Sequence, residues 1–279
     1  MPYRHAHYWV GFVLLVIVAG FWASYFAPIR TELPLAFHVH AVTAMAWLGF
    51  LIVQSVAIHR RMNALHRTIG KASFALFPLL IVGLAMIIGL SAHRYATSES
   101  AFIAYAGPSF AIGMAIAIAA YLTLFYQALR NRRNVKLHAG YMLATVLILF
   151  ESPFSRVIGD YLPWLNVIGS EGPQGVFDTI AISDALATAF ALVLYFRDPK
   201  HGAPWLVASA FMMLQAVVMW FTPGNAAIGE VLRAYAAIPA PITVTGAALL
   251  GAATCWLGWN AIPARPRRKG PGGPAAAAA

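Results

Sequence analysis

Eight long apolar stretches dominate this 279-residue sequence and leave few folds open to it. They cover residues 8–26, 35–58, 69–92, 102–129, 137–158, 176–196, 203–221 and 239–259. Each has about the length of a helix that crosses a bilayer, roughly 20 residues. Backbone polar groups inside lipid must be satisfied within the segment, so such stretches fold as helices. The sequence therefore predicts an all-α, polytopic transmembrane bundle of about eight spans.

The overall composition agrees with this class. Hydrophobic residues make up 61% of the chain and charged residues 10%, whereas soluble domains have roughly 45–50% and about 25%. A soluble enzyme, a disordered protein and a nucleic-acid-binding domain are excluded. The single cysteine, Cys255, excludes a disulfide framework. No cleavage pattern follows the first stretch, which we expect to be retained as a helix.

Positive charge predicts the orientation of the chain. With the N-terminus inside, 15 of the 19 Lys and Arg residues fall on the inner side, and the other four are Arg30, Arg94, Arg156 and Arg233. This bias follows the positive-inside rule, so we expect both termini in the cytoplasm. Residues 1–262 form one predicted membrane domain. Residues 263–279, rich in Pro, Gly, Ala and basic residues, form a predicted disordered tail.

Two inner hairpins resemble each other in sequence. Arg60-Arg61 and Arg132-Arg133 each precede a Leu-His pair that contains His66 or His138. The second and third stretches and the fourth and fifth stretches are thus a possible tandem pair of hairpins. The alternative is chance, because basic inner loops are expected in any case.

Several ionisable residues fall within the predicted spans, in the outer half of the membrane. Ionisable groups in lipid are costly and usually functional, so His40, Glu151 and Asp184 are our candidate catalytic residues, facing one outward cavity. The alternative is structural, an ion pair of Arg156 with Glu151 or with Asp178. One of the buried carboxyl groups is expected to be protonated.

Histidines suggest two further sites. His38 and His40 are candidate metal ligands, although their spacing on a helix points them about 200° apart unless the helix start is unwound. His66 and His138 occupy equivalent positions at the inner ends of two helices, an arrangement by which bundles hold haem, with Met142 as a possible axial thioether. The alternative for the inner pair is that ordinary interfacial histidines lie in basic loops.

Three short motifs carry a family resemblance: His-Val-His at 38–40, Leu-His-Arg-Thr-Ile-Gly at 65–70 and Leu-His-Ala-Gly-Tyr-Met at 137–142. With these motifs, residues 35–205 resemble a family of bacterial polytopic membrane proteins that has no agreed activity. The resemblance implies a helical bundle in the bacterial inner membrane. The organisation is also broadly similar to cytochrome b561-like haem bundles, but the chain lacks matched histidines near mid-helix, which argues against a two-haem wire.

Three functional hypotheses follow from these patterns. The first is a haem- or transition-metal-binding membrane protein with a redox role. The second is a proton-coupled transporter, and the third is an intramembrane hydrolase, for which no known motif is present. A non-catalytic subunit is also possible, binding a protein partner or a second copy through small-residue helix faces. These faces are Gly107, Ala111, Ala115 and Ala119, and Gly246, Ala247, Leu250 and Gly251.

Overall fold

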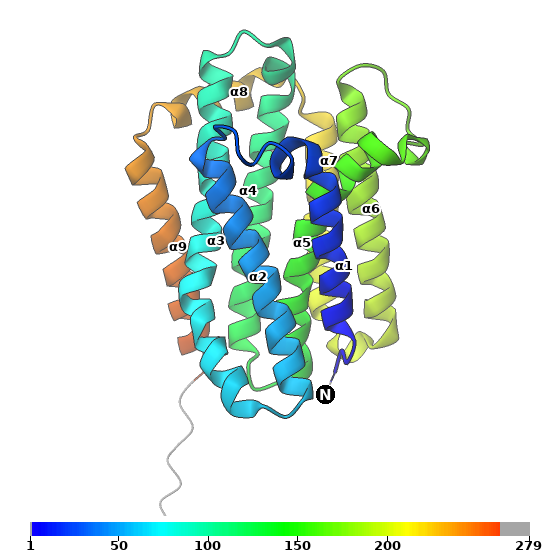
Figure 1. Ribbon diagram of the computed structural model, residues 1–279, viewed down its shortest axis with the longest axis vertical. Coiled ribbons are helices and arrows are strands. Elements are labelled where there is room, and N and C mark those ends of the chain that lie inside the picture. Colours follow the sequence, from blue (N-terminus) through cyan, green and yellow to red (C-terminus); the bar gives the residue numbers. More distant parts are fainter. Residues whose placement is uncertain (1, 263–279) are drawn as a thin grey trace, which may run out of the picture.

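The computed structural model describes residues 2–262 and confirms an all-α bundle (Figure 1). Its helices are α1 (Ala6–Gly20), α2 (Leu35–His59), α3 (Asn63–Thr97), α4 (Ala101–Arg130), α5 (Val135–Tyr161), α6 (Gln174–Arg197), α7 (Ala203–Phe221), α8 (Ala226–Ala236) and α9 (Ala240–Asn260). Seven of these helices, α2 to α7 and α9, are long and apolar enough to cross a membrane. The predicted tail, 263–279, lies outside the described residues.

The first predicted span differs from a single regular helix. The α-helical part, α1, has only 15 residues and ends at Gly20, and a π-helical turn follows at Trp22–Phe26. Gly20 lies directly against the carbonyl of Pro153 in α5, where an added Cβ would collide with that oxygen. The two helices therefore touch closely at this point. Immediately beyond it the chain continues as a π-helical turn, which is wider than an α-helical turn.

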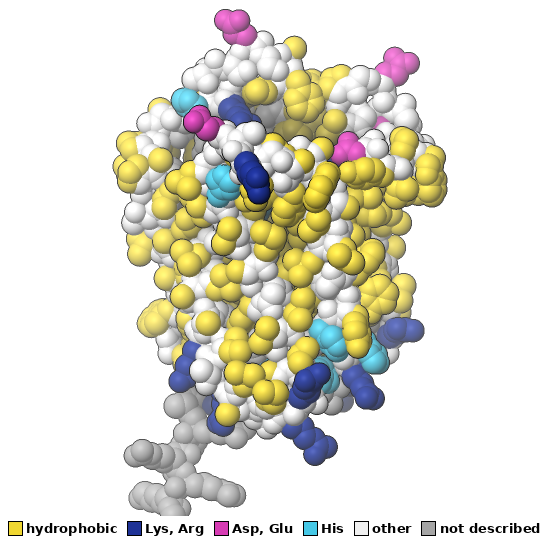
Figure 2. Space-filling view, viewed as in Figure 1, with side chains coloured by type: hydrophobic (Ala, Val, Ile, Leu, Met, Phe, Trp, Pro, Cys, Tyr) yellow, Lys and Arg dark blue, Asp and Glu magenta, His cyan; other side chains and the backbone are white. Residues whose placement is uncertain are grey.

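Charged side chains gather at the two ends of the bundle, and the acidic side chains visible in this view lie at one of them (Figure 2). We call the end with loops 60–62, 131–134 and 198–202 the basic end, and the opposite end the acidic end. Five exposed acidic residues lie in the segments at the acidic end: Glu32, Glu99, Asp160, Glu171 and Glu230. Asp198 is the one acidic residue of the described chain in the loops at the basic end. The N-terminus and the end of α9 also lie at the basic end (Figure 1).

Helix α5 occupies the middle of the bundle and packs against α1, α4, α6 and α7. Beside it, aromatic side chains fill the centre: Trp47, Phe77 and Phe125 are completely buried, and the rings of Phe77 and Phe125 stack 4.0 Å apart. Trp47 also donates a hydrogen bond of 2.9 Å to Oγ1 of Thr145 in α5. This cluster makes the middle of the bundle dense.

The predicted small-residue faces are partly used within the chain. Ala247 and Gly251 of α9 are buried, and Gly251 lies so close to Pro78 of α3 that a side chain would collide with it. On α4, Ala111 is buried, whereas Ala115 and Ala119 are exposed. Close backbone approach within the bundle therefore accounts for part of the pattern.

Helix α8 was not predicted from the sequence. It is short and amphipathic, and it lies across the acidic end against α3 and α4. Leu232 is its main buried side chain, and Arg233 lies over the ring of Tyr95 at 5.2 Å. A search for membrane spans misses such a helix because its 11 residues are too few to cross a bilayer and include Glu230 and Arg233.

Candidate binding site

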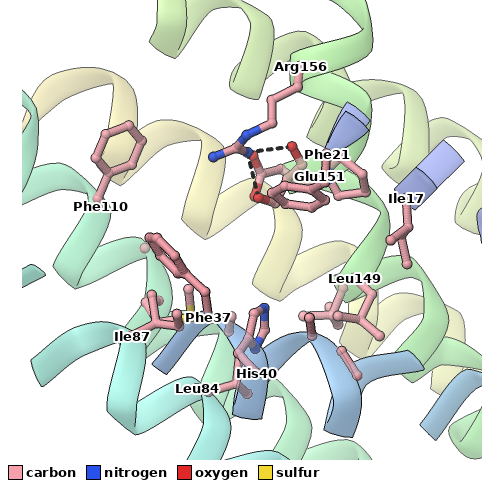
Figure 3. A pocket seen from close by; sticks show the side chains of 18 of the residues that line it. Ile17, Phe21, Phe37, His40, Leu84, Ile87, Phe110, Leu149, Glu151 and Arg156 are labelled. Atoms are coloured by element: carbon pink, nitrogen blue, oxygen red, sulfur yellow. Dashed lines mark hydrogen bonds between the residues drawn. The ribbon is translucent and has the colours of Figure 1, made fainter. Parts of the chain in front are cut away.

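A cavity of about 550 Å³ lies between the helices in the half of the bundle toward the acidic end. Its walls come from α1, the π turn and α2 to α7, and its lining is mainly apolar and aromatic (Figure 3). Volumes of this order are typical of sites for small organic ligands, roughly 300–1,000 Å³. The structure therefore provides room for such a molecule inside the membrane domain.

Two local irregularities shape the cavity wall. Ser24, Tyr25 and Phe26 of the π turn line it. On α5, Pro153 has no backbone N–H, so the carbonyl of Leu149 has no helical donor, and Leu149 also lines the cavity. The π turn and the proline place non-standard backbone beside the cavity.

Arginine side chains stand at the cavity on two helices. Arg94 of α3 lies over the ring of Phe37 at 5.4 Å, and Arg156 of α5 lies over the ring of Phe21 at 4.6 Å. Nη1 of Arg156 also donates to the backbone oxygen and the hydroxyl of Ser152, at 2.7 and 2.8 Å. Stacking and these hydrogen bonds hold the guanidinium group of Arg156 in place. Its other N–H groups, and all those of Arg94, make no hydrogen bond within residues 2–262.

Neither of the alternative ion pairs of Arg156, with Glu151 or with Asp178, forms. No carboxylate of the described chain lies within 4 Å of its guanidinium, although Glu151 is near enough for electrostatic interaction. Asp178 instead accepts hydrogen bonds from the backbone and hydroxyl of Ser170 and from the indole of Trp220. Asp178 therefore anchors the loop before α6 to the end of α7, and Arg156 keeps its charge toward the cavity.

The carboxyl groups of Glu151 and Asp184 are both buried. Oε2 of Glu151 accepts a hydrogen bond of 3.0 Å from Nε2 of Gln215, and both Glu151 and Gln215 line the cavity. Asp184 does not line it, but it is completely buried and close enough to interact electrostatically with Glu151. Neither oxygen of Asp184 has a hydrogen-bond partner among the described residues. A carboxyl group in this position is costly when charged.

The two histidines at the start of α2 have separate surroundings. His40 lines the cavity, its Nδ1 is buried without a partner in the described chain, and its ring interacts electrostatically with Arg156. Nδ1 of His38 instead lies 3.1 Å from the hydroxyl of Tyr25. Helix α2 is regular from Leu35 onward, so the unwinding required for a shared metal is not found. Within residues 2–262 no group of three or more His, Cys, Asp or Glu could hold a metal ion.

The inner histidines occupy matching positions, as their motifs suggest. Each is the fourth residue of its helix, and the amides of His66 and His138 donate to the oxygens of Met62 and Asn134 respectively. Nδ1 of His138 lies 2.8 Å from the carbonyl of Ala128. Since a carbonyl only accepts, this nitrogen carries a proton, and in the neutral imidazole Nε2 then keeps a lone pair. The two rings interact electrostatically. The tandem repeat itself stays a prediction.

The sequence pattern placed Arg94 only among the outer charges and missed its place at the cavity. Ile87, Ser91 and Arg94 follow the three- and four-residue spacing of one helix face, and all three line the cavity. That spacing was the available signal. Tyr121, at the floor, was also missed because a tyrosine in an apolar helix carries no distinguishing pattern.

No family model, curated protein or solved structure matches this chain. The resemblance to bacterial polytopic membrane proteins therefore stays a prediction based on its three motifs.

Proposed function

We propose that the protein is a proton-coupled transporter of a small organic anion that has an apolar body. One observation carries this proposal. Two arginine side chains, each stacked on a phenyl ring, share one mainly apolar cavity with a buried glutamate. Ionisable residues that face such a space within a membrane domain typically belong to a substrate or proton path.

The arginines support recognition of an acidic group. A guanidinium group can hold a carboxylate or sulfonate through two parallel hydrogen bonds, and Arg156 has N–H groups without a partner within the described chain. The aromatic and aliphatic lining, which includes Phe21, Phe37 and Met114, suits the rest of such a molecule. The proposed substrate is thus an amphipathic anion.

The carboxyl groups support coupling to protons. An anion held by Arg156 would repel an ionised Glu151, because both negative charges compete for one guanidinium group. Protonation of Glu151 removes that repulsion, so anion binding and proton binding favour each other. Asp184, adjacent and without a hydrogen-bond partner in the described residues, is the proposed second proton carrier, and His40 faces the same space.

Packed side chains at the floor of the cavity close it toward the basic end, so a transport cycle must rearrange them. Tyr121 lines the floor, and its hydroxyl donates a hydrogen bond of 2.9 Å to the carbonyl of Thr145. The buried aromatic cluster around Trp47 lies beyond it toward the basic end. Transport requires a second conformation in which this packing opens toward that end.

Proteoliposomes provide the test, with benzenesulfonate as a permanently ionised probe and benzenesulfonamide as its neutral control. An imposed inward proton gradient should drive accumulation of benzenesulfonate but not of benzenesulfonamide. Arg156→Gln should abolish accumulation, whereas Arg30→Gln, an arginine at the same end that is not among the residues lining the cavity, should not. Glu151→Gln should retain probe binding and lose its dependence on pH. Equal uptake by wild-type protein and Arg156→Gln would refute the proposal.

A second candidate function rests on the inner histidines. We infer that His66 and His138 are the residues that would hold a haem or a transition metal, because the hydrogen bond from His138 to Ala128 is the outer contact that metal-binding imidazoles usually make. The donors fit in kind, and Nδ1 of His66 is buried without a partner in the described chain. A bound haem would supply one-electron redox chemistry.

An optical spectrum with metal analysis on the same sample tests this second function. His66→Ala or His138→Ala should each abolish a Soret band, and His38→Ala should leave it intact. A band that survives in both inner variants would exclude the pair as ligands.

The environment of the protein belongs partly to this proposal. Its apolar helices indicate a lipid bilayer. We propose the bacterial inner membrane, with the basic end toward the cytoplasm, from the charge asymmetry and the motif resemblance.

A further inference from the structure

A second hollow lies on the side of the bundle, between α1 and α6. Both helices pack against α5, and the space between them, about 440 Å³, has α5 as its floor. Leu143, Leu147 and Phe150 belong to this floor. Apart from its end near the N-terminus, the lining is almost wholly apolar, which suits a hydrocarbon chain.

The walls of this groove are bridged by aromatic side chains. Trp9 of α1 and Phe190 of α6 both line the groove, and their ring centroids lie 5.8 Å apart. A helix with its side chains is roughly 10–12 Å wide, so it cannot enter between walls joined in this way. An acyl chain is much thinner and fits such a slot.

Cationic and aromatic groups lie at the basic end of the groove. Arg4 and His5 line it there and are exposed, and Tyr3 packs edge-on against Trp205 with ring centroids 5.7 Å apart. The side chain of Arg4 has no hydrogen bond or ion pair within residues 2–262. A free cation beside an apolar slot is complementary to a molecule with an anionic head and a hydrocarbon tail.

We propose that this groove binds one acyl chain of an anionic phospholipid from the leaflet at the basic end, with its phosphate at Arg4 and His5. Because the two walls are bridged, the groove accepts an acyl chain but not a helix. The positive charge of Arg4 favours an occupant with a negatively charged head. The proposal is independent of the function assigned to the other cavity, because the two hollows lie in different parts of the bundle and are lined by different residues.

Native mass spectrometry of the full-length protein released from nanodiscs tests the proposal. The nanodiscs contain equal amounts of phosphatidylglycerol and phosphatidylcholine, and the bound lipids are counted for each variant. Wild-type protein should retain one phosphatidylglycerol in preference to phosphatidylcholine. Arg4→Gln should reduce that preference about fivefold, the effect of one cationic side chain at an anionic membrane surface.

Matched variants separate the groove from the rest of the surface. Leu143→Trp, which fills the partly exposed floor, should remove the retained lipid, whereas Leu15→Trp, exposed on α1 outside the groove, should not. Arg60→Gln, an exposed cation at the same end, should leave the preference unchanged. Equal retention of both lipids by the wild type, or an unchanged preference in Arg4→Gln and Leu143→Trp, would overturn the proposal. A dimer that Leu143→Trp dissociates would also overturn it, because the groove would then hold a second copy.

Discussion

The two halves of the bundle use the same kinds of helix for different purposes. Toward the acidic end, the helices enclose a cavity bordered by Glu151, Arg156 and His40. In the middle of the bundle, large aromatic side chains such as Trp47 and Phe125 are completely buried and pack against one another. The comparison teaches that the densest packing and the proposed binding site lie in different layers. Substitutions in the two layers should therefore differ in their effects.

The largest effect is expected from Trp47→Ala. The indole is completely buried, packs on three phenyl rings and donates to Thr145, so its loss should lower the free energy of unfolding by about 3–5 kcal/mol. Met45→Ala, two residues away on the cavity wall, should cost about 1 kcal/mol or less. Unfolding in detergent measures both variants. Similar costs would mean that the two layers do not differ in packing.

Two aspartates on α6 offer a second contrast, with a smaller effect. Asp178 accepts three hydrogen bonds, so Asp178→Leu should cost about 2–3 kcal/mol of unfolding free energy. Asp184 accepts none from the described residues, and Asp184→Leu should be neutral or stabilising while it impairs proton coupling. Thermal melting and probe uptake should be measured on both. A large loss of stability in Asp184→Leu would show that this carboxyl group is structural.

The same substitution, Ala to Leu, placed in both layers should give a smaller difference in stability than the two contrasts above. Ala144→Leu in the packed layer, where Ala144 is completely buried, should cost about 1–3 kcal/mol through overpacking. Ala41→Leu adds its atoms to the cavity and should change stability little while it weakens binding of benzenesulfonate. Melting temperature and probe affinity form the readout. Equal destabilisation by the two variants would mean that the cavity cannot accept extra volume.

The smallest effect is expected at the basic end, at Asp198 in the loop between α6 and α7. The hydrogen bond from Lys136, and next that from His201, hold the pKa of Asp198 below its usual value. The stabilisation is therefore present above the pKa that Asp198 has in the unfolded chain, and it is lost as the pH falls through the lower folded value. Lys136→Ala should remove most of this pH dependence, as acid melting curves would show. Because the pair is exposed, the change should be the least of the four. A melting curve for Lys136→Ala that matches the wild type at every pH would show that the pair contributes nothing.

Sequence patterns predicted the spans better than the site. Six of the eight predicted stretches match helices to within a few residues, and a seventh, residues 69–92, corresponds to α3, which is longer at both ends. The break after Gly20 lies at a close contact with Pro153, which is more than 130 residues away in the chain and leaves no local signal. The proposed pairing of Arg156 with Asp178 failed for a similar reason. Matching depth does not ensure that two side chains face each other, and the loop residue Ser170 supplies donors that depth cannot reveal.

The sequence by itself determined the class of protein and the direction in which its helices run. Lipid requires long apolar helices, and the basic loops collect at one end, so both properties follow from composition along the chain. Only the tertiary structure decided which polar groups meet. His40, Glu151 and Arg156 come together, while His38 turns to Tyr25 and Asp178 to Trp220. The reason is geometric: a helix fixes the depth of each residue, but the packing of neighbouring helices determines what its side chain faces.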